Sequence, residues 1–408
     1  MLQGQSAVGR FRRKVIPSDP VLRIFALATL INTFGNGLFM TVEVIYFTTV
    51  IGLSAAKVAL ALSIAGGVSL LFSVPAGQIA DRRGPRGIAV LAYAAEGVVM
   101  SGFLLVHSFS TFLILSIRLG VVGTIGQTLR MAMMSKLGDG DRRVEIRAYQ
   151  RSVTNLGISL GTIFAGIALA LNTKFGYQTL LLLDAGTFLI AASVFRKLPF
   201  VEPTVKRGEP LTFVALKDRR YLGVTALNGI MSLHFILQNV AIPLWVVRET
   251  HAPRWWISVI MLVNTIGVIL FQVRVSRGSG DIRFGAKQVE RAGFAIACAC
   301  LLYALSSGVN AILACVLLVL AMMVHVYGEL VGSSGSWSIG FGMADEKHQG
   351  QYQGVYSLSW GVGGAIGPSF VTAMAISLGQ IGWVYMGIIF ATTGVLTHKL
   401  VTGHWIAT

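Results

Sequence analysis

The chain has 408 residues, of which 54% are hydrophobic and 12% are charged, and its mean hydropathy is +0.71. A water-soluble domain of this size is less apolar, so the composition predicts a membrane protein. The net charge of +16 does not indicate nucleic-acid binding, because the basic residues lie in short stretches between long apolar runs.

Long apolar runs predict twelve membrane-spanning helices, since about 20 apolar residues cross the hydrocarbon core of a bilayer. In chain order the predicted spans are 21–49, 54–79, 87–107, 109–134, 146–171, 175–196, 220–248, 255–275, 285–306, 309–332, 350–377 and 380–402. We therefore expect an all-α integral membrane protein.

The basic residues alternate between the connections. Most of the 33 Lys and Arg lie in the two terminal segments and in every second connection. The residues on the opposite side are Lys57, Lys174, Arg248 and Arg254. By the positive-inside rule both termini are cytoplasmic, and the short connections favour a bacterial inner membrane. Residues 1–20 are polar and basic, which does not fit a removable secretory signal.

The longest connection, 197–219, divides the predicted spans into six and six. It is charged and contains Pro199, Pro203 and Pro210, as expected of a linker. The predicted organisation is a cytoplasmic segment 1–20, an N-terminal bundle 21–196, the linker 197–219, a C-terminal bundle 220–402 and a cytoplasmic tail 403–408. Two similar six-helix bundles are a transporter architecture, because they can rock about a site at their interface.

The connection after the second predicted span carries the most specific motif. From Gly77 to Arg86 it reads GQIADRRGPR, which resembles the G-x-L-A-D-R-x-G-R-R signature of the major facilitator superfamily. The resemblance implies the major facilitator fold, and it assigns a conformational latch of the closed-outside state to Gly77, Asp81, Arg82, Gly84 and Arg86. Physically, glycine permits close approach and tight turns, and an aspartate can accept hydrogen bonds at a helix end.

Small residues in the fifth and eleventh spans predict close helix packing. They are Gly157, Gly161 and Gly166 in the fifth span and Gly363, Gly367 and Pro368 in the eleventh. The pattern in the fifth span resembles the antiporter motif of the superfamily, although Thr162 stands where that motif has proline. An antiport function and plain packing both stay open.

The sequence around the tenth and eleventh spans resembles the drug:proton antiporter branch of the superfamily. The match consists of Gly328-Glu329 and the run QGQYQGVY that begins at Gln349. The resemblance implies a working monomer that exports drugs or similar small lipophilic or cationic compounds in exchange for protons.

Ionisable residues inside spans are functional candidates, because a charge in hydrocarbon costs several kcal/mol unless it is paired or faces a cavity. Helical rise brings Glu43 and Arg118 to similar depths, so we expect them to pair either as a proton switch or as a permanent structural ion pair. The candidates for proton coupling are Glu43, Arg118, Asp184, His325 and Glu329.

Polar and adaptable side chains at helical spacing predict a substrate cavity. They are Asn32, Asn36, Phe39 and Met40 in the first span, Met231, His234 and Gln238 in the seventh, and Met322 in the tenth. The asparagines and the glutamine also keep open the alternative substrate class, a sugar, peptide or other polar metabolite.

Motifs for catalysis or cofactor binding are missing from the sequence. It has no G-x-S-x-G, no H-E-x-x-H and no phosphate-binding loop, and its three cysteines lie in apolar runs without metal-ligand spacing. We expect no enzyme, no metal and no other cofactor, with a proton gradient as the energy source. The expected partners are a small-molecule substrate, protons and membrane lipids. A receptor without transport activity stays a further alternative.

Overall fold

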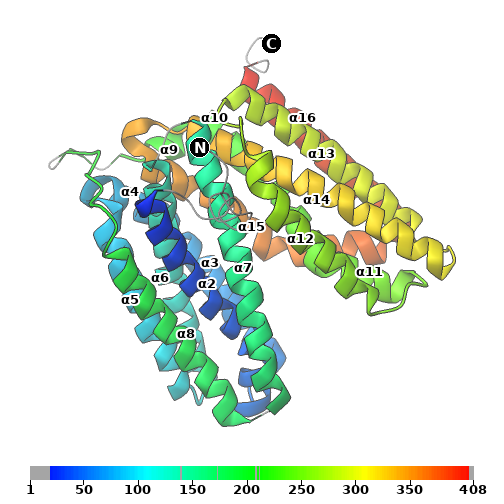
Figure 1. The fold of residues 1–408 in the computed structure, drawn as a ribbon, viewed down its shortest axis with the longest axis horizontal. Helices are drawn as coiled ribbons and strands as arrows, with labels where there is room; N and C mark the ends of the chain where they lie inside the picture. The colour runs from blue at the N-terminus through cyan, green and yellow to red at the C-terminus, as the bar shows by residue number, and fades with distance from the viewer. Residues whose placement is uncertain (1–18, 138–139, 172, 207–208, 211, 404–408) are drawn as a thin grey trace, which may run out of the picture. The chain divides into compact units, whose positions relative to one another are not determined.

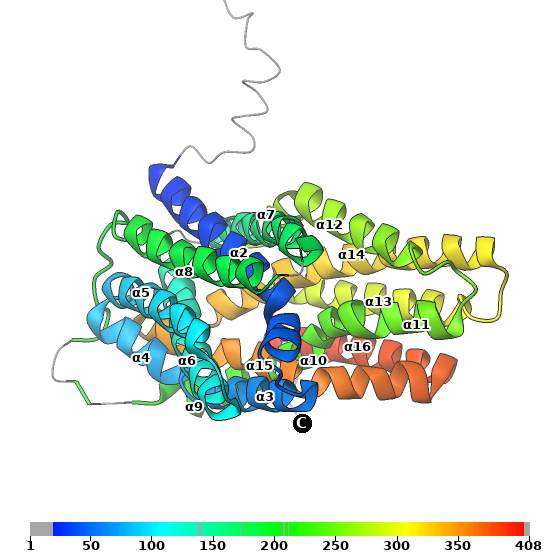
Figure 2. The ribbon, with the colours of Figure 1, turned by 90° about the horizontal axis from the view of Figure 1, so that it is seen from below.

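The computed structural model describes residues 19–137, 140–171, 173–206, 209–210 and 212–403. Within these ranges every regular element is a helix (Figures 1 and 2). The predicted cytoplasmic segment 1–20 and the tail 403–408 lie almost wholly outside the described residues, as do positions 207–208 and 211 of the predicted linker.

Apart from α14 and the bent pair α3 and α4, the helices follow the predicted spans closely. Their bounds are α2 (Pro20–Ile45), α3 (Ala55–Leu70), α4 (Ser73–Arg83), α5 (Pro85–Gly102), α6 (Phe109–Ser135), α7 (Asp141–Leu171), α8 (Lys174–Phe195), α9 (Val214–Lys217), α10 (Arg219–Ile236), α11 (Ile242–Glu249), α12 (Trp256–Val275), α13 (Ile282–Leu305), α14 (Ala311–Gly342), α15 (Gln349–Thr372) and α16 (Gly379–Thr402). Short π-helical turns continue α2, α10 and α15, at Tyr46–Val50, Leu237–Ala241 and Ala373–Ser377.

In the described part of the chain, nine helices are long and apolar enough to cross a membrane. The number is ten if Ala56–Leu70 and Ser73–Arg83, bent by 41° at their junction, form one span. The predicted spans 146–171 and 350–377 fall on α7 and α15, which are not among these helices, so the count of twelve stays a prediction.

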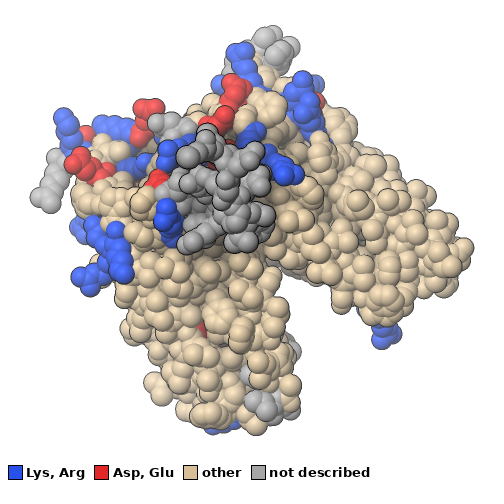
Figure 3. All heavy atoms as spheres, viewed as in Figure 1, with Lys and Arg blue, Asp and Glu red and all other residues tan. Residues whose placement is uncertain are grey.

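Large apolar side chains stand exposed along the helices. Leu91 is 68% exposed, Ile163 68% and Phe175 80%. Such surfaces are costly in water but suit a bilayer, where a helix also satisfies its own backbone hydrogen bonds. Figure 3 shows that the visible face of α11 to α14 carries few charged side chains, whereas Lys and Arg gather where α13 begins and α16 ends. The chain is therefore a multi-pass membrane protein.

The first of two compact units comprises Met1–Ala65, Gly84–Gly126 and Val153–Glu202. In it, α8 packs against both α2 and α5 (Figure 2). Part of α7 also lies against α2, because a Cβ on Gly157 would meet the Thr33 side chain and one on Gly161 the Phe34 carbonyl oxygen. Gly166 faces open space, so the prediction of close packing at this glycine is wrong.

The second compact unit comprises Gly66–Arg83, Gln127–Ser152 and Pro203–Thr408. Here α13 packs against α14 and α16, which run beside it in Figure 1, and α15 packs against α4 and α10. A Cβ on Gly363 would lie 2.8 Å from the Ser232 hydroxyl oxygen, and one on Gly367 3.0 Å from Ile236, so both glycines of α15 face α10 closely. The division cuts through α3, α6 and α7, and the predicted arrangement of six plus six helices stays a prediction.

Helix α14 extends beyond its predicted end. The predicted span stops at residue 332, whereas α14 continues to Gly342 through a segment rich in Gly and Ser. These residues are poor helix formers, but they pack tightly: a Cβ on Gly335 would meet the Gly285 carbonyl oxygen, and one on Gly332 would lie 2.9 Å from Ala292. Tertiary packing thus overrides propensity, and Glu329 lies in the helix interior rather than near its end.

The close approach of α4 to α15 gives a first prediction. A Cβ on Gly77 would meet the Gly350 carbonyl group, so Gly77→Ala forces the two helices apart. We expect the free energy of unfolding to fall by about 1–3 kcal/mol and the midpoint of thermal unfolding in detergent to be lower. Gly66→Ala is the control, since a Cβ there would meet nothing within 4 Å. Equal midpoints for the two variants would contradict this packing.

Candidate functional site

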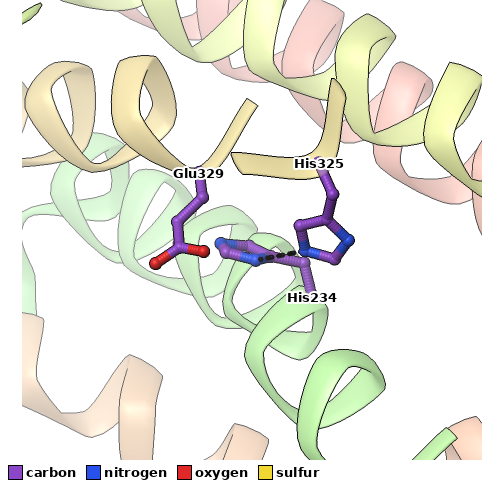
Figure 4. Close-up of side chains that lie close together, drawn as sticks. All are labelled: His234, His325 and Glu329. Carbon is purple, nitrogen blue, oxygen red and sulfur yellow. Dashed lines mark hydrogen bonds between the residues drawn. The ribbon is translucent and has the colours of Figure 1, made fainter. Parts of the chain in front are cut away.

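A cluster of three buried, titratable side chains lies inside the second unit. His234 comes from α10, and His325 and Glu329 come from one face of α14 (Figure 4). Their exposed fractions are 3%, 0% and 3%. A spacing of one helical turn places His325 and Glu329 side by side. A hydrogen bond of 3.2 Å joins Nδ1 of His234 to Nε2 of His325, so the two imidazoles form a continuous polar path.

The carboxylate of Glu329 is neutralised by Arg151 of α7. The Arg151 guanidinium donates to Oε1 of Glu329 and to the Ser333 hydroxyl. Oε2 of Glu329 accepts a 2.7 Å hydrogen bond from the side-chain amide of Asn264 on α12. Both carboxylate oxygens are therefore satisfied, as a buried charge requires. Helices α7, α12 and α14 thus supply the charged and polar groups that form this ion pair and its hydrogen bonds.

Aromatic rings surround the guanidinium of Arg151. Its Cζ lies 4.9 Å from the centre of the Phe235 ring and 5.9 Å from that of Trp337. Both rings line a cavity of about 20 Å³, which is room for about one water molecule. Met231, His234 and Ser333 also line it. The ion pair therefore borders a small space with mixed aromatic and polar walls.

The cluster has the atoms of a metal site but is organised as a hydrogen-bond network. Ligand atoms of His234, His325 and Glu329 lie within 4.8 Å of one another, close enough to share an ion. However, both Glu329 oxygens accept from Arg151 and Asn264, and the imidazoles bond to each other. Arg151 already supplies the positive charge that a cation would bring. Such a network is suited to holding and passing a proton.

The expected pair between Glu43 and Arg118 is not formed. No ion pair or hydrogen bond joins them in the part of the chain that the structure describes, and Glu43 instead lies close enough to Asp184 for their charges to interact. Oδ1 of Asp184 accepts from the Thr187 hydroxyl at 3.3 Å, and its Oδ2 has no partner among the described residues. Helical rise fixes the depth of a residue but not the direction of its side chain about the helix axis.

The predicted cavity residues of the first span have different environments. Asn32 and Phe39 are buried, and the Phe39 ring lies 5.8 Å from that of Phe103, centre to centre. Met40 is 66% exposed and Asn36 is half-buried. These four residues therefore differ in burial, and their assignment to a substrate cavity stays a prediction.

The predicted cavity residues of the second unit are all buried. Met231 and His234 line the cavity beside Arg151. Gln238 lies in the π-helical turn after α10, and its Oε1 has no hydrogen-bond partner among the described residues. Met322 packs away from the cavity, where its sulfur accepts from the Tyr303 hydroxyl at 3.9 Å. Two of the four residues thus belong to the site.

Asp81 of the predicted latch caps the start of α15. Its Oδ1 accepts from the Gly350 N–H at 2.8 Å, and its Oδ2 accepts from the Gln351 N–H at 2.9 Å. The first N–H groups of a helix have no partner within the helix and carry its positive end, so a carboxylate is a favourable cap. The cap holds α4 to α15.

The linker covers this cap. The carbonyl oxygen of Asp81 accepts from the N–H groups of Thr204 and Val205 at 2.9 and 3.1 Å. Arg82 donates to the carbonyl oxygens of Glu209 and Pro210. A hydrogen bond from Lys347 lowers the pKa of Glu209, so this carboxylate is charged at neutral pH. The linker thus adds both neutral and ionic contacts to the Asp81 cap.

The other two latch residues act within the first unit. Gly84 has a φ of +76°, which glycine adopts without strain, and a Cβ there would meet the Val201 carbonyl oxygen. Arg86 donates to the carbonyl oxygen of Arg196. Gly84 and Arg86 therefore fix the connection to α5, whereas Gly77, Asp81 and Arg82 join helices and linker in the second unit.

Sequence interpretation missed Arg151 and Asn264. Arg147 and Arg151 fall within the first six residues of the predicted span 146–171, where basic residues are counted with the flanking connection. Their presence inside that span, together with Glu329 in the tenth, is the signal that predicts a buried ion pair. Asn264 is uncharged, and no pattern in the sequence distinguishes it from other polar residues of spans.

Comparison with known proteins identifies the fold. Residues 25–368 match the family model described as Major Facilitator Superfamily. No curated protein matches the chain. The structure of the human organic anion transporter MFSD10 (TETRAN) is similar, with a TM-score of 0.72 and 16% identity, over 93% of this chain and 100% of that one. The structure of a bacterial homologue of the iron transporter ferroportin, in an outward-facing state, is also similar. Its TM-score is 0.74 and its identity 13%, over 94% of this chain and 99% of that one. At these identities the likeness shows the fold alone.

The Asp81 cap gives a second prediction. Asp81→Asn removes the charge and turns an amide NH2 toward backbone donors, so one hydrogen bond to the start of α15 is lost. We expect the free energy that holds the start of α15 closed to fall by about 1 kcal/mol. Hydrogen–deuterium exchange at the amides of Gly350 and Gln351 should therefore be about fivefold faster.

Asp345→Asn is the matched control. Asp345 accepts from the N–H groups of Lys347 and His348 and pairs with the His348 ring, all before α15, so its loss leaves the bonds to the Gly350 and Gln351 amides intact. Unchanged exchange at Gly350 and Gln351 in the Asp81 variant would show that the carboxylate does not hold the start of α15.

Proposed function

Because this chain belongs to the major facilitator superfamily, we propose that it is a secondary transporter that exports small lipophilic compounds in exchange for protons by alternating access. The membrane-spanning helices and the two similar structures, both described as transporters, support transport rather than catalysis. The proposal includes a bacterial inner membrane with cytoplasmic termini, on the basis of the alternating basic residues.

The buried pair of Arg151 and Glu329 carries the proposal of proton coupling. Protonation of Glu329 removes its charge and leaves Arg151 without a counterion. Breaking a buried ion pair by loss of one charge costs about 3–5 kcal/mol, so the protonated protein favours a conformation in which Arg151 meets water or another partner. Because the pair joins α7 to α14, its release changes the contacts between these helices.

Four helices present charged or polar groups to the Glu329 carboxylate. They are α7 with Arg151, α10 with His234, α12 with Asn264 and α13 with Tyr303. On α14 itself, His325 bonds to His234 through one ring nitrogen, while its Nδ1 has no partner among the described residues. We assign the two imidazoles to proton transfer toward Glu329, because neutral imidazole both donates and accepts.

Carboxylates of the first unit stay candidates for a second proton site. Glu43 and Asp184 lie within electrostatic reach of each other, and one Asp184 oxygen is unpartnered among the described residues. Two neighbouring carboxylates repel each other when both are ionised. Arg118 has no place in this mechanism.

The walls of the cavity beside Arg151 favour lipophilic substrates, and the cavity, which here has room for about one water molecule, has to widen to admit one. Aromatic rings of Phe235, Trp337, Tyr356 and Trp360 line it. Aromatic walls bind apolar bodies of varied shape. Cationic compounds, which the sequence favours together with lipophilic ones, are less suitable, because the adjoining charged residue is the cation Arg151.

Transport measurements on the variant Glu329→Gln give a third prediction. In liposomes with an imposed pH gradient, we expect wild-type protein to accumulate a lipophilic dye, tested with one anionic and one cationic compound. In the variant, gradient-driven accumulation falls at least about tenfold, because glutamine neither loses nor gains a proton. Exchange of labelled for unlabelled dye without a gradient continues, which separates lost coupling from lost folding.

Glu290→Gln is the matched control. Glu290 pairs with His398 at 2.5 Å outside the cluster, so its loss removes a carboxylate without touching the Arg151 pair. Unimpaired gradient-driven accumulation in the Glu329 variant would exclude this residue from coupling. If wild-type protein moved neither dye but accumulated a sugar or peptide, the export function itself would be wrong.

A further inference from the structure

Arginine side chains gather beside the Glu329 pair, within the second unit. Arg130 comes from α6, and Arg147 and Arg151 come from successive turns of α7. The charges of Arg130 and Arg151 both act on Arg147. Among the described residues the ion pairs include one acid for this cluster, Glu329, and it binds Arg151. Three positive charges thus face one negative charge.

Some hydrogen-bond donors of this cluster are buried and unused. The Nε atoms of Arg130 and Arg147 have no hydrogen-bond partner among the described residues. Gln150, on the same helix and 2% exposed, has neither side-chain amide atom satisfied in the described structure. Buried donors without acceptors are unfavourable, and guanidinium donors are the more so because they are charged. The Nε donors of Arg130 and Arg147 therefore have no acceptor within the described structure.

Trp337 holds the two arginines of α7 without using their N–H donors. Cζ of Arg147 lies 5.7 Å from the centre of the Trp337 ring, and Cζ of Arg151 lies 5.9 Å from it. An aromatic face attracts a cation through its π electrons and provides no oxygen acceptor. Arg151 already donates to Glu329 and Ser333, whereas the guanidinium edge of Arg147 stays available for a planar or tetrahedral oxyanion, which arginine binds with two parallel hydrogen bonds.

We propose that Arg147 and Arg130 bind the anionic group of the transported compound, and that the substrate class is organic anions with an apolar body. The aromatic residues Trp337, Phe235 and Trp360 line the adjoining cavity and provide the apolar contact. A carboxylate, sulfonate or phosphate group would supply the missing acceptor and reduce the repulsion among the arginines. This inference rests on the proposed transport function, but binding tests it separately.

The test measures ligand binding by thermal unfolding of the purified full-length protein. The probes are 2-naphthoate as an aromatic carboxylate, inorganic phosphate as a bare oxyanion, and tetraphenylphosphonium as a lipophilic cation. We expect 2-naphthoate to raise the unfolding temperature in a concentration-dependent manner, since a ligand of the folded state stabilises it. In Arg147→Gln the apparent Kd should rise at least about tenfold. Arg291→Gln, an exposed position on α13, should bind as the wild type does.

The unliganded Arg147 variant distinguishes a binding role from a structural role. If Arg147 is kept for binding, its removal relieves repulsion and an unsatisfied donor, so ligand-free Arg147→Gln unfolds at a higher temperature than wild type. A lower unfolding temperature together with unchanged 2-naphthoate binding would mean a structural arginine and would overturn the inference. Arg130→Gln provides a second variant with the same expectations.

The remaining outcomes are equally decisive. If phosphate stabilises the protein, 2-naphthoate does not, and Arg147→Gln abolishes the effect of phosphate, the oxyanion site is supported. The apolar body of the proposed substrate is then contradicted. Stabilisation by tetraphenylphosphonium and not by 2-naphthoate overturns the anion site. If anions fail to bind while the pH gradient still drives the cationic dye in a Glu329-dependent manner, the inference fails and the proposed function stands.

Discussion

The burial of the Glu329 carboxylate in the interior of a membrane helix is the constraint on which the site depends. A charge at 3% exposure needs a counterion and hydrogen bonds, and the chain provides them from Arg151 and Asn264, with the imidazoles of His234 and His325 close by. Each partner comes from a different helix, so the arrangement of α7, α10, α12 and α14 is tied to one ionisable group. A change in that charge therefore acts on several helices at once.

Close helix contacts through glycine allow such a network to form. Gly335 of α14 lies against the Gly285 carbonyl oxygen of α13, and Gly77 of α4 lies against α15. The same closeness lets the Asp81 side chain reach the first N–H groups of α15, where the linker then covers it. Because glycine contacts leave little tolerance, these interfaces have a few discrete arrangements rather than a continuous range, which suits alternating access.

The sequence predicts the helices well and the contacts between them poorly. Helix positions follow from apolar length and basic flanks, which are local properties, so the helices lie close to the predicted spans. The latch motif is also a local property, and it identifies Asp81 as a candidate. That Asp81 accepts a hydrogen bond from the Gly350 N–H follows only from the folded structure. The Glu43 and Arg118 pair fails because depth does not determine side-chain direction, and Arg151 was missed because its position near the start of a span resembles a flanking charge. Pairings between distant helices depend on rotation about each helix axis, which hydropathy does not encode.

The central claim is that Glu329 changes its protonation as the protein changes conformation. The most direct measurement is the transient current that a pH step alone, without substrate, produces from liposomes adsorbed on a solid-supported membrane. The wild-type protein should give a transient as protons enter the site and Arg151 is released, and Glu329→Gln should give a much smaller one. A transient of equal size in the variant would contradict the claim, because the proton would then bind elsewhere.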